Sequence, residues 1–496
     1  MGRTVRMTGP PASGVEDSSA PRTRLSVSKR RLIDHFDGLA AGVGRWTRNR
    51  HYHGPLAQFL RFVIPSGAEV LEIGCGDGEL LAALEPRRGV GVDISGGMAR
   101  RASGKHAGLR FLQGDAEDLP VSGSFEYVVL SDLIGYLEDV QAAFDNLHCV
   151  SSPDTRVVIT YFNYLWEPVL SLAQTLRLMT PQRRQNWLAL ADIENLLLLS
   201  DFEVIKTGYR LLLPVWIPGV SWAVNHLVAK LPGIRKLCLV QYVIARPRRR
   251  PAGLTSPSVS VVIPCRNERG NIANAVERMP RMGRATELIF VDGNSTDGTA
   301  AEIERVARLH ADRWDITLLH QGTGTGKGDA VRKGFAAAKG DVLMILDADL
   351  TVPPEDLPKF FEALRSGKGE FINGTRLVYP MERQAMRRLN LLGNKFFSLA
   401  FTWLLEQRFR DTLCGTKVLF RRAYERIAAN RHYFGDFDPF GDFDLIFGAS
   451  KLNLKILEIP VRYRERTYGV TNISRFRHGL LLLRMCGVAF RRLKLD

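Results

Sequence analysis

The stretch that decides the fold of the first half of the chain is VLEIGCGDGEL, residues 70–80. Its apolar start predicts a buried strand, its three glycines predict a tight turn, and its last residues begin a helix. The glycines allow the backbone to bend sharply and let a ligand approach without a Cβ in the way. About 20 residues after the turn, Asp93 ends a second predicted strand, where a carboxylate can bind both hydroxyls of a ribose. The stretch therefore predicts an α/β sheet that binds a ribose-containing ligand.

Two details of this turn separate the classes of protein that bind such ligands. Gly78 comes one position earlier than the third glycine of the nicotinamide-dinucleotide fingerprint, and Glu79 stands where that fold needs a small residue. A third predicted strand ends at Asp115, near the place of an adenine amino group. In this order the motifs resemble the class I methyltransferases over residues 32–245, with a dinucleotide-binding protein as the alternative. The resemblance implies that S-adenosylmethionine binds to Glu72, Gly74, Gly76, Gly78, Asp93, Asp115 and Ala116.

The group that removes a proton from the methyl acceptor stays unassigned. Many small-molecule members of the family carry a histidine after the fourth strand, whereas this chain has Tyr136 at that place, in SDLIGYL, residues 131–137. We expect Tyr136 to have a packing role.

The second half carries three ordered polar motifs, each of which ends a predicted strand. They are SVVIPCRNE at 260–268, ELIFVDGNSTDGT at 287–299 and LDAD at 346–349. Carboxyl ends of parallel strands meet at one edge of a sheet, where ligands gather. In an extended segment Asp347 and Asp349 lie on one side and Ala348 on the other. Two such carboxylates suit a hard divalent cation, which neutralises a diphosphate leaving group.

The run GTGTGKG, residues 322–328, is not a P-loop. The spacing from Gly322 to Gly326 is one residue short, and Gly328 replaces the hydroxyl residue that would bind magnesium.

These motifs resemble the family 2 glycosyltransferases over residues 257–475, and in particular the polyprenyl-phosphate sugar transferases. GTR at 374–376, DTLCGTK at 411–417 and YRERTYG at 463–469 also look like theirs. One departure is Gly293, where many relatives carry a second aspartate after Asp292. The resemblance implies a GT-A fold, an inverting single displacement, a UDP- or GDP-sugar donor, and Mg²⁺ or Mn²⁺ held by Asp347 and Asp349. It implies that the nucleotide-sugar contacts Pro264, Arg266, Glu268, Asp292, Asp297, Lys327, Asp347, Ala348, Arg376 and Arg464.

A general base is needed only if the sugar acceptor is a hydroxyl, because a phosphate acceptor is already ionised. The candidate base is Asp442, which lies in FGDFDPFGDFD, residues 434–444. A structural role in this loop is the alternative. Asp349 is the other residue to which we assign a catalytic role.

Strand and helix patterns alternate in both halves, which predicts an α/β chain with two Rossmann-like domains, each on a parallel sheet. The first is the methyltransferase fold and the second the GT-A fold. The expected divisions are a disordered basic arm at 1–30, the methyltransferase domain at 31–245, a linker at 246–257 and the glycosyltransferase domain at 258–496.

Composition restricts the partners and the compartment. The formal net charge of +16 attracts nucleic acid, acidic lipid or phosphate-bearing substrates. We expect no nucleic-acid partner, because the chain has no recognisable module for one. The six cysteines form no CxxC pair, which argues against a disulfide framework or a zinc site and favours the cytoplasm. The apolar run Leu211–Ala229 is interrupted by prolines, so we expect it to lie at an interface and not to span a membrane.

The leading hypothesis is a bifunctional enzyme that methylates one acceptor and transfers a sugar to a lipid-linked or glycan acceptor. The alternative keeps the glycosyltransferase and makes the first half a docking or cofactor-binding module without turnover. Leu391–Leu405 and Leu480–Phe490 are apolar, too short to span a membrane, and flanked by basic residues. They predict peripheral binding to the inner membrane face. Packing of both segments on the sheet is the other interpretation.

Overall fold

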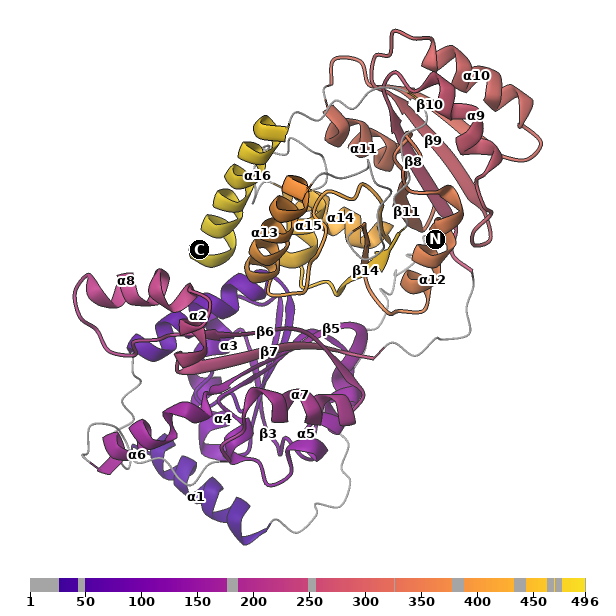
Figure 1. Cartoon of the computed structure of the whole chain (residues 1–496). Coiled ribbons are helices and arrows are strands. Elements are labelled where there is room, and N and C mark those ends of the chain that lie inside the picture. The colour runs from indigo at the N-terminus through magenta and orange to yellow at the C-terminus, as the bar shows by residue number, and fades with distance from the viewer. Residues whose placement is uncertain are drawn as a thin grey trace, which may run out of the picture. The chain divides into compact units, whose positions relative to one another are not determined.

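The computed structural model describes residues 26–42, 50–175, 186–248, 256–324, 326–376, 388–431, 443–461, 468 and 475–495. The chain forms two compact units (Figure 1). The first comprises Met1–Val204, Tyr209–Ile217 and Leu237–Pro247, and the second comprises Ile205–Gly208, Pro218–Lys236 and Arg248–Asp496. Helix α1 begins at Val27, inside the predicted arm; the arm up to residue 25 and the linker from 249 to 255 lie outside the described residues. The domain limits stay predictions.

The first unit is built on a seven-stranded sheet with the order β3-β2-β1-β4-β5-β7-β6. Its central strands are rich in apolar residues and largely buried, as expected for strands that are covered on both faces. The strands are β1 (Glu69–Ile73), β2 (Arg88–Asp93), β3 (Arg110–Gln113), β4 (Phe125–Ser131), β5 (Ser151–Phe162), β6 (Phe202–Arg210) and β7 (Val240–Pro247). The helices are α1 (Val27–Ala40), α2 (Arg50–Val63), α3 (Glu79–Ala83), α4 (Gly96–Lys105), α5 (Val140–Asn146), α6 (Glu167–Thr175) and α7 (Leu190–Leu199).

The prediction of a purely parallel sheet was wrong at β7. This strand runs antiparallel to β5, with Val157 opposite Ala245, and it lies between β5 and β6. A dinucleotide-binding sheet has the order 3-2-1-4-5-6, without a reversed strand at this place. The strand order therefore disfavours the dinucleotide-binding alternative. Apolar runs along the chain do not specify the direction of a strand that follows a long connection, such as the one between β6 and β7.

The second unit is built on a seven-stranded sheet with the order β10-β9-β8-β11-β13-β12-β14. Its strands are β8 (Val259–Cys265), β9 (Thr286–Asp292), β10 (Asp315–His320), β11 (Val342–Ile345), β12 (Phe371–Thr375), β13 (Lys417–Phe420) and β14 (Ile456–Pro460). Its helices are α8 (Val220–His226), α9 (Arg269–Glu277), α10 (Thr299–Leu309), α11 (Gly326–Ala337), α12 (Leu357–Arg365), α13 (Arg388–Leu405), α14 (Arg421–Ala429), α15 (Phe443–Lys451) and α16 (Arg475–Phe490).

This sheet also departs from the parallel prediction at one strand. Strands β8 to β11 pair in parallel, but β13 runs antiparallel to both β11 and β12. The sheet is therefore mixed.

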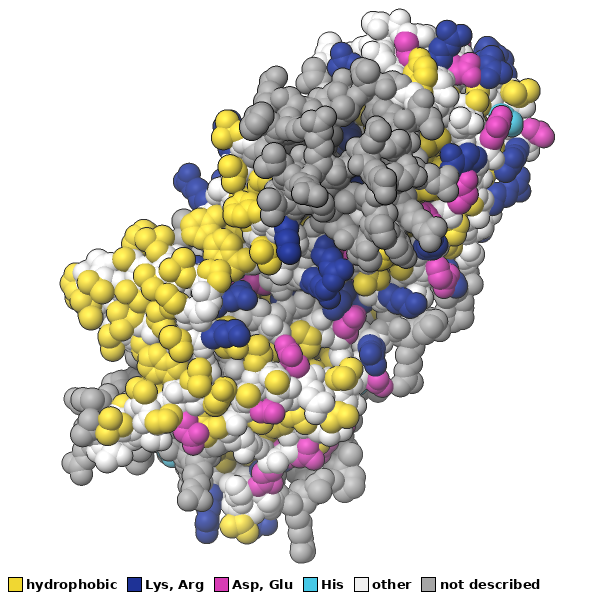
Figure 2. Space-filling model, in the orientation of Figure 1, with side chains coloured by type: hydrophobic (Ala, Val, Ile, Leu, Met, Phe, Trp, Pro, Cys, Tyr) yellow, Lys and Arg dark blue, Asp and Glu magenta, His cyan; other side chains and the backbone are white. Residues whose placement is uncertain are grey.

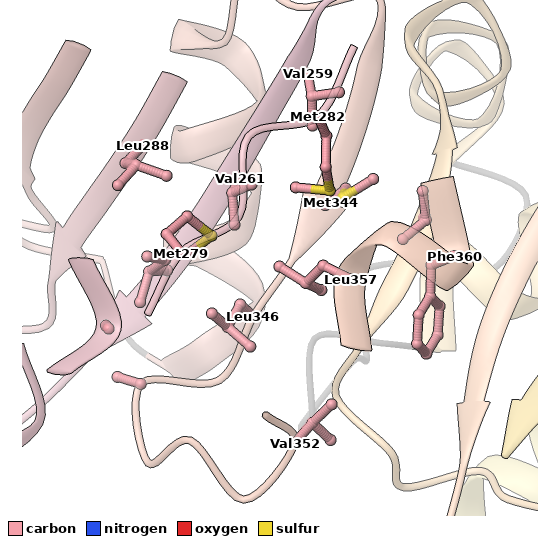
Figure 3. Packing of buried hydrophobic residues seen from close by; sticks show 14 of the residues in the cluster. Val259, Val261, Met279, Met282, Leu288, Met344, Leu346, Val352, Leu357 and Phe360 are labelled. Carbon is pink, nitrogen blue, oxygen red and sulfur yellow. The ribbon is translucent and has the colours of Figure 1, made fainter. Parts of the chain in front are cut away.

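The hydrophobic core of the second unit lies directly below its carboxyl-end motifs. Leu346, Ala348 and Leu350 are 0%, 4% and 7% exposed and belong to one cluster with Met344 and Leu357. Figure 3 shows Leu346 among these residues. Every second side chain after β11 is therefore anchored in the core, so the intervening aspartates point away from it.

Among the described residues, no helix combines the length and hydrophobicity that crossing a bilayer requires. In the apolar run Leu211–Ala229 the longest helix is the seven-residue α8, and Trp216 and Trp222 are 63% and 59% exposed there. Helices α13 and α16 each bury one face and expose another: Phe401 and Met485 are buried, whereas Leu399 and Leu480 are 67% and 70% exposed. Figure 2 shows hydrophobic side chains exposed over α8, α13 and α16.

Candidate functional sites

The glycine turn between β1 and α3 adopts backbone conformations that other residues rarely take. Gly74 and Gly78 both have φ of 76° and Gly76 has φ of 54°. A Cβ on Gly78 would lie 2.5 Å from the Phe111 ring. The turn is tied to the neighbouring strand, because the Gly74 amide donates to the Val92 carbonyl at 2.7 Å. The sequence motif thus forms the tight turn that it predicts, at the carboxyl end of β1.

Asp93, at the end of β2, faces this turn. Its Oδ2 accepts a hydrogen bond from the Gly76 amide at 2.8 Å, and its Oδ1 accepts one from the Ser95 amide at 2.9 Å. Burial raises the pKa of Asp93, and these two amides oppose that rise. Glu72 is 2% exposed, behind the turn. The glycine turn and the Asp93 carboxylate are therefore in contact, as a ribose site requires.

Asp115, at the predicted adenine place, already has a cationic partner that the sequence did not reveal. Lys29 of α1 places Nζ 2.6 Å from Asp115 Oδ2 and 2.8 Å from Glu117 Oε2. The Asp115 Oδ1 accepts a hydrogen bond from the Glu117 amide at 3.0 Å, and Ala116 between them is buried. Helix α1 also holds Asp37 against the Gly97 amide at 2.9 Å. The first helix thus closes over this edge of the sheet, although it lies far from the motifs in the sequence.

Three aromatic residues, Phe36 of α1, Tyr52 of α2 and Tyr136, contact one another or the loop after β4. The Tyr136 ring packs edge-on against Phe36 of α1, with ring centroids 5.7 Å apart. Asp132, which no motif singled out, accepts a hydrogen bond from the Tyr52 hydroxyl at 2.7 Å. Tyr136 thus packs against Phe36, as expected, and the Asp132 carboxylate lies close to it in the sequence.

In the second unit, Asp347 and Asp349 are partly exposed and Ala348 is buried, as the alternation predicts. Lys327 Nζ lies 2.6 Å from Asp347 Oδ1. Burial acts to raise the pKa of Asp347, but Lys327, Lys417 and Arg376 together hold it below its usual range. Asp349 Oδ1 accepts hydrogen bonds from the Thr351 hydroxyl at 2.9 Å and its amide at 3.2 Å. Asp347 is therefore held in its ionised form, and hydrogen bonds or an ion pair fix the position of each carboxylate.

Gln321 organises the loop that carries Lys327. It is 4% exposed, and its Nε2 donates to the Gly326 carbonyl at 2.7 Å and to Asp329 Oδ2 at 3.0 Å. Its backbone amide donates to the Asp292 carbonyl at 2.9 Å, which joins the loop to the end of β9. The glycine-rich run thus serves to position a lysine beside the Asp-x-Asp pair.

The ends of β8 and β9 lie side by side, since the Gly293 amide donates to the Cys265 carbonyl at 2.8 Å. Pro264 is partly exposed and Arg266 is exposed at this edge, whereas Asp292 is 4% exposed. These positions suit contacts with a nucleoside.

Two other predicted contact residues at this edge have internal partners. Glu268 accepts a hydrogen bond from Asn271 Nδ2 at 2.7 Å. Asp297 accepts the Thr299 amide at 3.0 Å and the Arg269 amide at 3.2 Å. Burial acts to raise the pKa of Asp297, but its hydrogen bonds hold it below its usual range. Both carboxylates therefore hold the loops at this edge in shape.

Arg376 forms a two-pronged ion pair that the sequence did not predict. Its Nε lies 2.7 Å from Asp411 Oδ2 and its Nη2 lies 2.8 Å from Asp411 Oδ1, and Asp411 is 2% exposed. Lys417 is fully buried and donates to the Cys414 carbonyl. The run 411–417 therefore supplies buried charges, and that of Lys417 acts on Asp347. Asp442 and Arg464 lie outside the described residues, so their assignments stay predictions.

The residues at this site fit a divalent cation that a diphosphate helps to hold. Among the described residues, no group of three or more His, Cys, Asp or Glu side chains is arranged around a common metal position. Magnesium sites for phosphate substrates use one or two carboxylates and complete their coordination with phosphate oxygens and water. Asp347 and Asp349 supply such a donor set.

Comparison with known families matches both units. Residues 260–430 match the model of "Glycosyl transferase family 2", and residues 46–207 match the model "Methyltransferase domain". Magnesium protoporphyrin IX methyltransferase from Synechocystis is a solved structure with 18% identity and a TM-score of 0.32, covering 44% of this chain and 99% of its own.

Two curated relatives match the second unit. Dolichol-phosphate mannosyltransferase of Saccharomyces cerevisiae is 39% identical over 26% of this chain and 51% of its own length. Glycosyltransferase AglJ of Haloferax volcanii is 30% identical over 45% of this chain and 69% of its own length. The chain thus spans about half of the first relative and about two thirds of the second. By these matches, this chain belongs to glycosyl transferase family 2 and carries a methyltransferase domain in its first half.

Proposed function

We propose that the second unit transfers a sugar from a UDP- or GDP-sugar to a polyprenyl phosphate or another lipid-linked acceptor. The observation that carries the proposal is the Asp347–Asp349 pair at the end of β11, with Lys327 and Arg376 near it. The names of the relatives, one a dolichol-phosphate mannosyltransferase, support a lipid-linked acceptor. Mg²⁺ or Mn²⁺ bound by the two aspartates would stabilise negative charge on the leaving diphosphate.

The residues around this pair have separate tasks. Lys327, which lies beside Asp347, would add positive charge next to the diphosphate. Arg376 is held by Asp411 and supplies fixed positive charge. Fixed charges aimed at developing negative charge need no reorganisation during the reaction.

The first unit, on this proposal, binds S-adenosylmethionine through the glycine turn, Asp93 and Asp115, and methylates an acceptor. The Asp93 contacts with the Gly76 and Ser95 amides place its carboxylate at the turn. Lys29 is next to the adenine place, so α1 would form one wall of the cofactor site.

The enzyme would work at the inner face of a membrane. Leu399 of α13 and Leu480 of α16 are exposed, and Arg491 and Arg492 at the end of α16 are exposed too. Lys494, one of the basic residues that follow Leu480–Phe490 in the sequence, is instead 5% exposed and pairs with Glu406 at 2.5 Å. Apolar faces edged by cations suit a helix in the headgroup plane.

The experiment that tests the sugar-transfer proposal is a thermal unfolding series with UDP or GDP, with and without MnCl₂. One nucleotide should raise the Tm of the wild type, and more so with manganese, because ligands that bind the native state stabilise it. Asp347→Asn should lose the manganese-dependent part of the shift. If neither nucleotide shifts the Tm with manganese present, the proposed donor class is wrong.

A further inference from the structure

One carboxylate of the run 131–137 to which no role has been assigned, Asp132, lies at the carboxyl edge of the first sheet. It follows β4 directly, and β4 lies between β1 and β5 in the middle of the sheet. The next residue, Leu133, touches the cofactor turn: a Cβ on Gly74 would lie 2.9 Å from Leu133 Cδ1. Asp132 is therefore one residue away from the contact between the β4 loop and the glycine turn.

Specific contacts hold Asp132 in an unusual conformation. Its φ is 54°, in the left-handed region that non-glycine residues seldom adopt. The Asp132 amide donates to the Thr160 carbonyl at 2.9 Å, and the Tyr52 hydroxyl donates to Asp132 Oδ1 at 2.7 Å. Among the described residues, no donor is bound to the second carboxylate oxygen. Backbone strain that the surroundings maintain is typical of functional positions.

The surroundings of Asp132 shift the ionisation of its carboxylate to near neutral pH. Burial raises the pKa of Asp132 to about 7, and the hydrogen bond from Tyr52 opposes the rise. The phenols of Tyr52 and Tyr161 have raised pKa values, mainly through burial, so they stay neutral. The negative charge of Asp132 contributes to both rises in pKa, and that of Glu167 contributes to the rise for Tyr161. The His53 ring packs edge-on against Tyr52, with centroids 5.0 Å apart.

The far side of the loop is closed by backbone contacts. Asn186 donates from its amide to the Gly135 carbonyl at 2.9 Å and from Nδ2 to the Leu137 carbonyl at 2.7 Å. The Tyr161 hydroxyl donates to the Asn186 carbonyl. The loop that carries Asp132 is thus also held by Asn186.

We propose that Asp132, oriented by Tyr52, faces the sulfonium of bound S-adenosylmethionine and takes the proton of the methyl acceptor. This rests on the proposed methyltransferase function. The acceptor is then a group whose attacking oxygen or nitrogen carries a proton. A lone pair of that atom forms the bond to the methyl carbon, the carbon–sulfur bond breaks with its electrons going to sulfur, and the proton passes to the Asp132 carboxylate. One cation and one carboxylate are consumed, and a neutral thioether and a neutral carboxylic acid are formed.

The test uses the full chain and the two forms of the cofactor. Calorimetry measures the Kd of S-adenosylmethionine and of S-adenosylhomocysteine at pH 6, 7 and 8. The first carries the sulfonium charge and the second does not, while the rest of the molecule is shared. Ionised Asp132 attracts the sulfonium, so the preference for S-adenosylmethionine should rise on the order of tenfold from pH 6 to pH 8.

Two variants separate Asp132 from other titrating groups such as His53. In Asp132→Asn the preference should be independent of pH, with S-adenosylhomocysteine affinity within about twofold of the wild type. In Tyr52→Phe the rise should move to higher pH, because the carboxylate loses a donor that stabilises its ionised form. Thermal unfolding confirms that both variants are folded.

The outcomes distinguish a wrong assignment of Asp132 from a wrong proposal of methyltransferase function. If both cofactor forms bind but the preference does not vary with pH in the wild type, or varies equally in Asp132→Asn, the assignment of Asp132 is wrong. If neither form binds to the wild type at any pH, the proposed methyltransferase function itself fails.

Discussion

Gly415 leaves the space in which Lys327 meets Asp347. A Cβ on Gly415 would lie 2.0 Å from Asp347 Oδ2 and 2.5 Å from Lys327 Nζ. The ion pair, at 2.6 Å, therefore depends on a residue without a side chain about 70 positions further along the chain. The glycine belongs to the run 411–417, which also supplies Asp411 and Lys417.

The first prediction is that Gly415→Ala lowers sugar transfer while the second unit stays folded. The added methyl group must displace Asp347 from its position, and a misplaced catalytic group costs on the order of 10²-fold in rate. Gly487→Ala is the matched control, because a Cβ there meets nothing within 4 Å. Transfer at the wild-type rate in Gly415→Ala would show that Asp347 need not stay where the structure has it.

The second prediction concerns the methyl donor. Asp93→Ala should lose S-adenosylhomocysteine binding in calorimetry, since the ribose hydroxyls are left without their acceptor. The same change leaves the Gly76 and Ser95 amides without a carboxylate, so a lower Tm is expected as well. Asp154→Ala, at an exposed position, should bind as the wild type does. Binding that survives Asp93→Ala would remove this residue from the cofactor site.

The third prediction compares two ion pairs with the same two-pronged geometry. Asp411→Ala removes the buried carboxylate that holds the Arg376 guanidinium, which should lower the free energy of unfolding by about 3–5 kcal/mol. Glu355→Ala breaks the ion pair with Arg278. Because the side chains of Arg278 and Glu355 are 32% and 54% exposed, this change should lower the free energy of unfolding by only about 0.2–1 kcal/mol.

Urea denaturation measures both changes. Equal losses in the two variants would mean that the burial of Arg376 and Asp411 does not matter for stability.

How far the sequence predicts this protein depends on whether a feature is local. Strands such as Glu69–Ile73 and the turn after it were predicted because their residues are consecutive. The alternation of Asp347 and Asp349 is local in the same way. The families followed from such local motifs, and the comparisons confirm them.

The features that the sequence did not predict join distant segments. Lys29 reaches Asp115 across 86 positions, Tyr52 reaches Asp132 across 80, and Arg376 reaches Asp411 across 35. No periodicity pairs such residues. The reversed strands β7 and β13 were missed for the same reason, since direction depends on the connection and not on the apolar run. For Asp132, the only local signal was a charged residue directly after a buried strand.

The fourth prediction concerns membrane binding. With anionic liposomes, Leu399→Glu combined with Leu480→Glu should abolish flotation, because both exposed side chains would enter the headgroup region. Leu309→Glu in α10, where the leucine is 62% exposed, is the control and should float like the wild type. Binding of the wild type should weaken as salt is raised.

A wild-type protein that stays out of the floating fraction at low salt would contradict membrane binding. A soluble acceptor would then fit better than a lipid-linked one.

The fifth prediction tests the central claim, metal-dependent sugar transfer at Asp347 and Asp349. Labelled UDP- and GDP-sugars are incubated with a short polyprenyl phosphate, Mn²⁺ or Mg²⁺, and the wild type, Asp349→Asn or Asp315→Asn, whose aspartate is 63% exposed. We predict transfer of one sugar by the wild type and by Asp315→Asn, and a loss on the order of 10²-fold or more in Asp349→Asn and in excess chelator. Undiminished transfer in Asp349→Asn, or in chelator, would contradict the account.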